Sequence, residues 1–518
     1  MSDGIHHITA ITRKVQDNVD FYAGFLGLRL VKQTGGFEDA RQLHLLYGDA
    51  VGSPGSLVTF LVWEDGSGGR VGHGQASEIA FAIAPASIGF WLTRALAFNL
   101  RPEGPSRAFD EPVLRLRDPD GIVVKLVGSD LKSARPWHAP DIPAEHAIAR
   151  VRGATLLSET PHETAAFLQA HFGYRPGSTN AEGTTLRLVS HAGDAIDIVN
   201  AHGFWEQAPG TGTIDHIAMR APDIDHVARV EAALRRVSGT VTNLHDRRYF
   251  TSLYVREPGG ALLELATDGP GFTIDEPEAE LGTTLFTPPG GDSETRLVLP
   301  QFARPGEPRM RYHDLPFIHR FHIPDDADDT TIVLLHGTGG DEADLFPLAH
   351  RIAPRARLLG VRGRSHEEGV QRWFRRTSAT TFDQTDLRAE AEAFAEFTEA
   401  ANAAYGLDPA RTVYLGYSNG ANLLGALLSV RPHTVRRAIL LRGIAVLNDP
   451  PAADLSDAAV LLVTGSRDPY GRLAPALEEA LRAGKADLDA HSIDAGHELS
   501  GIDIELSRAW LAARALID

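Results

Sequence analysis

An internal repeat with a period of about 140 residues occupies the first half of the chain. The clearest pair of copies is RLRDPDGIVVKLVG (115–128) and YVREPGGALLELAT (254–267), and SEIAFAIAP (77–85) resembles DHIAMRAP (215–222) in the same way. Each copy of the clearest pair reads as a strand, a turn with an acidic residue, proline and glycine, and a second strand, which is typical of a β-hairpin. A chain that repeats such a pattern is expected to fold into similar modules.

Stretches with helical periodicity subdivide the repeat. Each copy contains two of them, so that each copy divides into two βαβββ-like units. We therefore expect an α+β architecture of paired βαβββ modules, with one domain over 1–148 and a second over 149–285. The helical stretches are 16–25, 87–98, 161–171 and 224–236.

Residues 286–310 are rich in proline and glycine and show no periodicity, which is typical of a linker. Beyond them, the apolar strands TTIVLLHG (330–337), TVYLGYSNG (412–420) and AVLLVTG (459–465) alternate with helical segments. Such an alternation indicates a mainly parallel sheet that is buried on both faces. We expect a doubly wound α/β domain over 311–518.

The composition narrows the possible partners. The formal net charge is -18 at pH 7, which disfavours nucleic acid and anionic membranes, because binding to phosphate requires clustered lysine and arginine. The chain has no cysteine, which excludes disulfides, thiolate nucleophiles and cysteine-ligated zinc or iron–sulfur sites. The first residues lack the features of a signal peptide, and no apolar run approaches the ~18 residues of a membrane span. We expect a cytoplasmic protein.

The pentapeptide GYSNG (416–420) follows an apolar strand and precedes a helix-prone segment. In a G-x-S-x-G motif the glycines allow a sharp turn that exposes the serine at the carboxyl edge of the sheet, so we expect Ser418 to be a nucleophile. Asp468 follows a later strand and His497 lies near the end of the sequence. The order Ser, Asp, His is that of the α/β-hydrolases.

The same motif predicts the roles of its neighbours. His497 would take the proton from Ser418, while Asp468 would hold the imidazole tautomer. HGTGG (336–340) closes the first strand of this part of the chain, where backbone N–H groups can face a developing oxyanion. The expected N–H donors are those of Thr338 and Asn419.

Residues 310–518 resemble the phospholipase/carboxylesterase family of small serine esterases. The segment GVQRWFRR (369–376) is similar to the Arg-Trp-Phe segment of its bacterial carboxylesterase branch. The resemblance implies a short ester or thioester as the substrate. Trp373 is expected either to line the acyl pocket or to pack as a buried aromatic.

The two copies of the repeat differ at positions that could bind a metal. The second copy has His216 where the first has Glu78, and Glu264 where the first has Lys125. A further histidine, His7, opens the first strand of the chain. Two imidazoles and a carboxylate on three strands form the 2-His-1-carboxylate set of non-haem Fe(II) enzymes. Glu264 also lies in an otherwise apolar strand, where a buried charge requires a compensating cation.

Residues 1–285 resemble the vicinal oxygen chelate superfamily, whose units are paired βαβββ modules, and more narrowly its ring-cleaving dioxygenases that act on hydroquinones. The motifs that carry this resemblance are GIHHIT (4–9), GTIDHIA (212–218) and REPGGALLELATD (256–268). The resemblance implies Fe(II), with Mn(II) as the alternative, held by His7, His216 and Glu264.

The same resemblance implies further residues near the substrate. Arg247 would hold a phenolate or a developing negative charge, with Arg248 as an alternative inward cation, and Tyr254 would donate a hydrogen bond or pack. The hydroquinone branch tends to have a second histidine before the ligand histidine, and here that position holds Asp215, which titrates lower and carries charge. The residues expected near the substrate are His6, Thr9, Asp215, Arg247 and Tyr254.

Three functions remain open on these observations. The first is a bifunctional enzyme in which one part cleaves a hydroquinone or catechol with dioxygen and the other hydrolyses an ester. The second is a glyoxalase-like metal-dependent lyase or isomerase fused to an esterase, and the third is an aromatic-binding resistance module. The expected partners are a small aromatic substrate, dioxygen and a small ester. A homo-oligomer is one expectation, because superfamily members often dimerise, and pairing of modules within one chain is the other.

Overall fold

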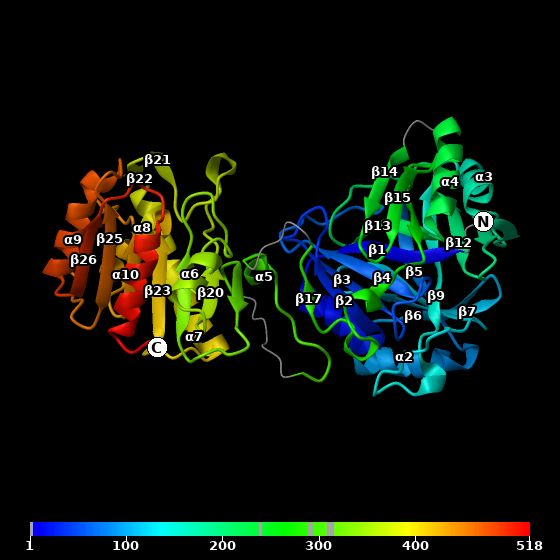
Figure 1. Ribbon diagram of the computed structural model, residues 1–518, viewed down its shortest axis with the longest axis horizontal. Helices are drawn as coiled ribbons and strands as arrows, with labels where there is room; N and C mark the ends of the chain where they lie inside the picture. Colours follow the sequence, from blue (N-terminus) through cyan, green and yellow to red (C-terminus); the bar gives the residue numbers. More distant parts are fainter. Residues whose placement is uncertain (1–3, 238–240, 289–293, 308–314, 518) are drawn as a thin grey trace. The chain divides into compact units, whose positions relative to one another are not determined.

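The computed structural model describes residues 4–237, 241–288, 294–307 and 315–517. The chain divides into two compact units, Met1–Arg309 and Met310–Asp518 (Figure 1). Each unit has its own hydrophobic core. Within the described ranges, no helix has the length and the apolar composition that crossing a membrane requires.

Two mixed sheets form the first unit. The nine-stranded sheet has the order β14-β15-β16-β13-β1-β4-β3-β2-β17, and the eight-stranded sheet has the order β10-β11-β12-β9-β5-β8-β7-β6. The strands of the nine-stranded sheet are β1 (Ile5–Thr12), β2 (Arg29–Gly35), β3 (Leu43–Gly48), β4 (Leu57–Val62), β13 (Thr213–Ala221), β14 (Val241–Asp246), β15 (Thr251–Arg256), β16 (Leu262–Thr267) and β17 (Leu285–Phe286). Those of the eight-stranded sheet are β5 (Gln75–Ile83), β6 (Glu103–Ala108), β7 (Glu111–Arg117), β8 (Val123–Gly128), β9 (Arg150–Ser158), β10 (Arg175–Thr179), β11 (Thr185–Val189) and β12 (Ala195–Asn200).

Helices follow the first strand of each module, as the periodicity of the sequence predicts. They are α1 (Val15–Val19) with its π-helical continuation η1 (Asp20–Phe25), α2 (Ile88–Ala97), α3 (Pro161–Phe172) and α4 (Ile224–Val237). The short helix α5 (Thr295–Val298) lies after the modules, beyond β17. Short 3-10 turns are η2 (Pro85–Ser87), η3 (Ala144–His146), η4 (Phe272–Ile274) and η5 (Glu278–Glu280).

The two copies of the repeat share both sheets. β1 from the first copy pairs antiparallel with β13 from the second, and β5 from the first pairs antiparallel with β9 from the second. The copies that we expect over 1–148 and 149–285 are therefore interleaved in one compact unit with one continuous core. This exchange of strands brings residues about 210 positions apart in the sequence onto neighbouring strands.

Part of the segment expected as a linker, 286–310, packs on the first unit. Leu299 belongs to the core of that unit. The Gln16 side chain donates to the Ala303 carbonyl at 3.0 Å and accepts from its N–H at 2.8 Å. Residues 289–293 and 308–310 of this segment lie outside the described residues.

A seven-stranded sheet with the order β18-β20-β19-β23-β24-β25-β26 forms the second unit. Every pair of neighbouring strands in this sheet is parallel except the pair β18 and β20, which is antiparallel. This arrangement confirms the doubly wound, mainly parallel architecture. Helix α7 packs on α8, and α6 packs on α10. The elements are β18 (His319–His322), β19 (Thr331–Leu335), α6 (Phe346–Ile352), β20 (Arg357–Val361), η6 (Glu367–Gly369), β21 (Arg376–Ser378), β22 (Thr381–Phe382), α7 (Gln384–Tyr405), β23 (Thr412–Tyr417), α8 (Asn419–Val430), β24 (Arg437–Leu441), β25 (Ala459–Gly465), η7 (Gly471–Leu473), α9 (Ala474–Ala483), β26 (Asp487–Ile493) and α10 (Gly501–Ala512).

Two tryptophans of the first unit provide a test of its core. Trp91 on α2 is fully buried, and its indole N–H donates to the His146 carbonyl at 3.0 Å. We expect Trp91→Ala to lower the free energy of unfolding by about 3–5 kcal/mol, because it leaves a large cavity. Trp205 is 79 % exposed, so Trp205→Ala should change that free energy by less than about 0.5 kcal/mol. Urea unfolding followed by circular dichroism measures both, and equal effects would contradict this assignment of the core.

Candidate active sites

His7, His216 and Glu264 lie on three adjacent strands at the centre of the nine-stranded sheet. His7 on β1 and Glu264 on β16 both pair with Ala218 of β13, one from each side. His216 precedes Ala218 by two residues, so its side chain lies on the same face of the sheet. Ala218 is fully buried, and its small side chain leaves room for the three larger ones to meet over it.

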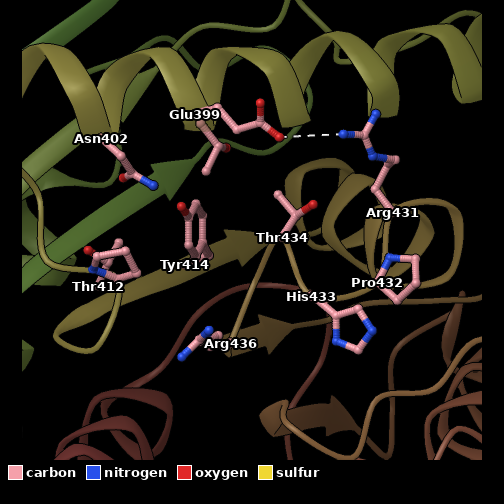
Figure 2. A pocket seen from close by; sticks show the side chains of 11 residues that line it. Glu399, Asn402, Thr412, Tyr414, Arg431, Pro432, His433, Thr434 and Arg436 are labelled. Atoms are coloured by element: carbon pink, nitrogen blue, oxygen red, sulfur yellow. Dashed lines mark hydrogen bonds and ion pairs between the residues drawn. The ribbon is translucent and has the colours of Figure 1, made fainter.

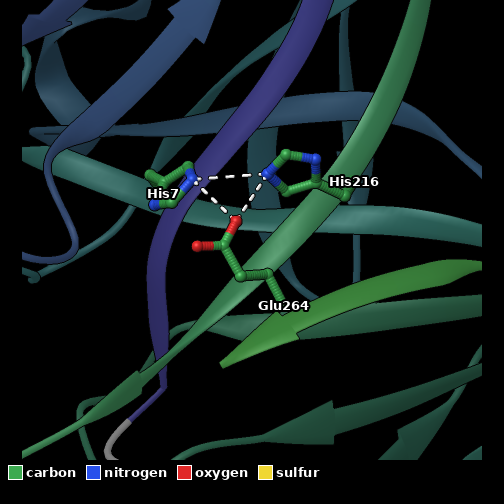
Figure 3. Close-up of side chains that lie close together, drawn as sticks. All are labelled: His7, His216 and Glu264. Atoms are coloured by element: carbon green, nitrogen blue, oxygen red, sulfur yellow. Dashed lines mark hydrogen bonds and ion pairs between the residues drawn. The ribbon is translucent and has the colours of Figure 1, made fainter. Parts of the chain in front are cut away.

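The ligand atoms of these three side chains converge (Figure 3). The Oε2 atom of Glu264 lies 2.7 Å from Nε2 of His216 and 3.4 Å from Nε2 of His7, and the two Nε2 atoms are 3.4 Å apart. His216 is 7 % exposed, His7 is 3 % exposed and Glu264 is fully buried. The structure therefore brings together the complete set that the sequence singled out.

The chemistry of this set fits a divalent cation. Glu264 Oε2 is buried and has no well-directed hydrogen-bond donor among the described residues, although two imidazole nitrogens lie beside it. Burial raises the pKa of Glu264, but the neighbouring histidines, His7 first, outweigh burial and hold this pKa well below its usual range. An ionised carboxylate and two imidazole nitrogens that point at one spot are the donors that a 2-His-1-carboxylate metal site requires.

The imidazole of His216 interacts with two carboxylates, those of Asp215 and Glu264. Burial lowers its pKa, but the neighbouring carboxylates of Asp215 and Glu264 outweigh burial and raise the pKa to about 9. The imidazole therefore holds a proton at neutral pH, between two carboxylates. A cation bound by Nε2 would displace that proton, since only a deprotonated nitrogen is a ligand.

His6 and Asp215, which the sequence places at the substrate, contact the ligand imidazoles instead. Nδ1 of His6 lies 2.9 Å from Nδ1 of His7, and Oδ2 of Asp215 lies 2.7 Å from Nδ1 of His216. His6 is buried, and its other ring nitrogen bonds to the backbone of Thr267. Both side chains therefore lie behind the rings, opposite the nitrogens that converge.

Tyr254 and Arg247 lie beside the centre, as expected. The Tyr254 ring packs edge-on against the His216 ring at a centroid distance of 5.3 Å, and Tyr254 pairs with Glu264 across β15 and β16. Burial, followed by the charge of Glu264, raises the pKa of the phenol. The guanidinium of Arg247 lies 5.9 Å from the Tyr254 ring, whereas Arg248 bonds to Asp275 at 3.1 Å. Arg247, which also pairs with Glu38 at 2.8 Å, is therefore the cation beside Tyr254.

Thr9 joins a polar chain that sequence reasoning missed. Its hydroxyl lies 2.9 Å from that of Thr59, which lies 3.0 Å from Nε2 of His44. Burial, followed by the proximity of His7 and His216, lowers the pKa of His44 to about 3, so the ring is neutral. The signal in the sequence is weak, because His44 is one histidine in the apolar strand LHLLYG, and its neighbours come from other strands.

The first copy of the repeat has an ion pair at the corresponding position. Lys125 Nζ lies 2.9 Å from Glu78, and the Thr155 hydroxyl donates to the same carboxylate at 2.8 Å. The positive charge of Lys125 and the negative charge of Glu78 therefore compensate each other. The two copies therefore differ in chemistry as their sequences indicate.

Ser418, His497 and Asp468 form a hydrogen-bonded series in the second unit. Ser418 Oγ lies 2.9 Å from Nε2 of His497, and Nδ1 of His497 lies 2.8 Å from Oδ2 of Asp468. The residues follow β23, β26 and β25, at the carboxyl edge of the parallel sheet where α/β active sites form. Ser418 has φ 51°, which is the strained turn of a nucleophile elbow.

Close packing surrounds the elbow. A side chain at Gly420 would place its Cβ 2.1 Å from the carbonyl oxygen of Leu335, so only glycine allows α8 to approach β19. Thr338 is exposed in the loop after β19, and Asn419 is the first residue of α8. Because β19 and β23 are adjacent, both predicted oxyanion donors lie at the ends of neighbouring strands.

Trp373 does not line an open pocket. Its side chain is fully buried against Phe317 and Phe394. The indole N–H donates to the His336 carbonyl at 2.9 Å, and the backbone N–H donates to Oδ1 of Asn419 at 2.8 Å. Of the two roles that the sequence allows, the structure favours the packed aromatic, which supports the loop and the helix beside Ser418.

The second unit also has a cavity of about 380 Å³, whose lining residues are shown in Figure 2. None of the three residues Ser418, Asp468 and His497 lines it. Side chains from α7, from β23 and from the loop after α8 line it, including Asn402, Thr412, Tyr414 and Arg431. Thr412 opens β23, whereas Ser418 follows its other end. The cavity is therefore not the ester-binding site.

Arg442 is a second functional residue that sequence reasoning missed. Its fully buried guanidinium pairs with Asp503 at 2.7 Å. It also donates to the carbonyls of Gly496 at 2.9 Å and Glu498 at 3.1 Å, the residues on either side of His497. A lone arginine after an apolar strand was the only signal in the sequence, because the residues that it holds lie more than 50 positions further along.

Arg442→Lys is expected to lower kcat for hydrolysis of p-nitrophenyl acetate by up to about 100-fold, since a small displacement of a catalytic group has this effect. Lysine keeps the charge for Asp503 but cannot reproduce the guanidinium fork that reaches both carbonyls. Arg431→Lys, at a surface ion pair with Glu392, is the matched control and should leave kcat unchanged. Unaltered kcat in a folded Arg442→Lys protein would show that this clamp does not position His497.

Comparison with known proteins identifies relatives named as dioxygenases and a relative named as a hydrolase. Residues 4–126 match the Glyoxalase/Bleomycin resistance protein/Dioxygenase superfamily. MhqO of Bacillus subtilis (strain 168), named as a ring-cleaving dioxygenase, is 36% identical over 285 residues, which are 55% of this chain and 91% of MhqO. The chlorohydroquinone/hydroquinone 1,2-dioxygenase of Sphingobium indicum is 31% identical over 301 residues, which are 55% of this chain and 92% of that enzyme.

A different relative matches a smaller share of the chain. MhqD of Bacillus subtilis (strain 168), named as a hydrolase, is 34% identical over 186 residues, which are 36% of this chain and 93% of MhqD. Together with the nucleophile elbow and the parallel sheet, this match supports the assignment of the second unit as an α/β-hydrolase. The chain belongs to the glyoxalase/bleomycin resistance protein/dioxygenase superfamily, as a ring-cleaving dioxygenase homologue fused to an α/β-hydrolase.

Proposed function

We propose that the chain is a bifunctional enzyme, an Fe(II)-dependent extradiol-type dioxygenase for hydroquinones or catechols joined to a serine carboxylesterase. The observation that carries the first activity is the convergence of His7, His216 and Glu264 over Ala218. A relative named as a chlorohydroquinone/hydroquinone 1,2-dioxygenase supports the substrate class. Residues 1–285 would carry ring cleavage, and residues 311–518 would carry ester hydrolysis.

In the first unit the proposed ligands are His7, His216 and Glu264. When bound there, Fe(II), or alternatively Mn(II), supplies the redox chemistry that lets dioxygen react with an aromatic ring. Ser252 donates to Oε1 of Glu264 and so fixes the orientation of the carboxylate. The remaining oxygen, Oε2, is the one that faces both imidazoles.

The side chains beside this centre would orient the substrate. Arg247 is a permanent cation, and it would attract an ionised phenol or a carboxylate that forms on ring opening. The raised pKa of Tyr254 keeps its phenol protonated at neutral pH, so Tyr254 would be able to donate a hydrogen bond to the substrate. The hydroxyl chain of Thr9 and Thr59 would supply a second polar contact, with the neutral His44 at its end.

In the second unit the proposed chemistry is acyl transfer. Ser418 Oγ attacks the ester carbonyl while His497 Nε2 takes its proton, and the same proton passes to the leaving alcohol. Water then cleaves the acyl-enzyme with His497 again as the base. Asp468 holds Nδ1–H and stabilises the imidazolium, and the N–H groups of Thr338 and Asn419 would stabilise the oxyanion.

The first activity is tested by metal analysis together with oxygen uptake. Protein loaded with Fe(II) is expected to consume oxygen when hydroquinone or a substituted hydroquinone is added. His216→Ala should lose the metal and reduce oxygen uptake to background, because two ligands do not hold the ion. An oxygen electrode that stays silent while the metal is bound would contradict ring cleavage and favour a glyoxalase-like lyase or isomerase.

The second activity is tested with p-nitrophenyl acetate. Ser418→Ala is expected to lower kcat for ester hydrolysis by about 10⁶-fold, as removal of a triad nucleophile does. The same variant should retain the oxygen uptake of the unaltered protein, and His216→Ala should retain ester hydrolysis. Residual hydrolysis at the unaltered rate in Ser418→Ala would show that another group is the nucleophile.

A further inference from the structure

Two β-bulges lie in the strand pair that carries the histidines. Along β1 and β13, Ile5 pairs with Met219 and His7 with Ala218, so His6 is an extra residue on β1. Thr9 pairs with His216 and Ala10 with Ile214, so Asp215 is an extra residue on β13. A bulge redirects a side chain that would otherwise point to the opposite face of the sheet.

Each redirected side chain contacts the imidazole that follows it in the sequence. Nε2 of His7 and of His216 faces the metal centre, so Nδ1 of each ring points away from it. His6 lies 2.9 Å from the Nδ1 of His7, and Asp215 lies 2.7 Å from the Nδ1 of His216. Each contact leaves Nδ1 as the protonated nitrogen and Nε2 as the one with the free lone pair.

The two contacts differ in charge. A ring nitrogen of His6 can accept from His7 only while it has a free lone pair, so His6 supports His7 as a neutral ring. Asp215 accepts from His216 as a carboxylate, and a hydrogen bond to an ionised acceptor is about twice as strong as one between neutral groups. A carboxylate behind a ligand imidazole also makes that imidazole the better electron donor to a metal.

We propose that Asp215 is a positioning residue for the metal centre, which fixes the tautomer of His216 and makes it the stronger of the two imidazole ligands. The bulge at His6 supports His7 in the same way, but without charge. This inference rests on the proposed function, because it requires a metal at His7, His216 and Glu264. Asp215 thus takes no part in proton transfer with the substrate, and its influence passes through His216.

The test measures binding of Co(II), a spectroscopic probe, to the full chain. Asp215→Asn keeps a hydrogen-bond acceptor but removes the charge, and we expect Co(II) to bind about 10- to 100-fold more weakly. The visible absorption bands of bound Co(II) should shift, because a weaker imidazole donor changes the ligand field. Asp215→Glu should restore part of the affinity. Circular dichroism and the Tm of the metal-free protein should stay as in the unaltered chain.

Two further variants complete the design. Glu163→Gln replaces an exposed carboxylate of α3 and should leave Co(II) affinity unchanged. His6→Asn should weaken Co(II) binding less than Asp215→Asn does, since no charge is lost behind His7. Equal losses in these two variants would refute the asymmetry between the two imidazoles.

The outcomes separate this inference from the function on which it rests. If His216→Ala abolishes Co(II) binding while Asp215→Asn binds with unaltered affinity and spectrum, the role of Asp215 is refuted and the metal site stands. If His216→Ala binds Co(II) as tightly as the unaltered chain does, both the metal site and the role of Asp215 are refuted.

Discussion

The antiparallel pairing of β1 with β13 is the contact on which the proposed metal centre depends. It joins the first strand of the chain to a strand from the second copy of the repeat, and it places His7 beside Ala218. The parallel pairing of β13 with β16 then places Glu264 on the other side of the same alanine. Backbone hydrogen bonds along these strands hold three buried polar side chains close enough to share one cation.

The second site depends on a different property of sheets. Its strands are parallel, so the loops after β23, β25 and β26 emerge at one edge and carry Ser418, Asp468 and His497 with them. Arg442, which follows β24, emerges at the same edge and binds the loop that contains His497. One edge therefore provides both the reacting groups and the cation that holds their loop.

Local patterns in the sequence predicted the elements well, and they singled out two sets of three side chains that the structure brings together. The helical stretches, the hairpins, the parallel sheet and both sets of three residues were visible because each depends on spacing, on polarity or on a difference between copies of the repeat. The roles of Trp373, Arg442 and His44 were not visible. Each role depends on which distant strand or loop lies beside the residue, and a single sequence does not report such contacts. His6 and Asp215 were expected at the substrate, because the bulges that turn them toward the imidazoles leave no mark in the hydrophobic pattern.

The eight-stranded sheet repeats the same two bulges, at Ser77 and Arg152, without a metal set. Lys125 and Glu78 stand where Glu264 and His216 stand in the other sheet, and they neutralise each other directly. At this position of the eight-stranded sheet, the polypeptide itself supplies the positive charge that balances the buried carboxylate. The same bulged strand pair therefore occurs with two sets of side chains. One set forms an ion pair, and the other forms the proposed metal site.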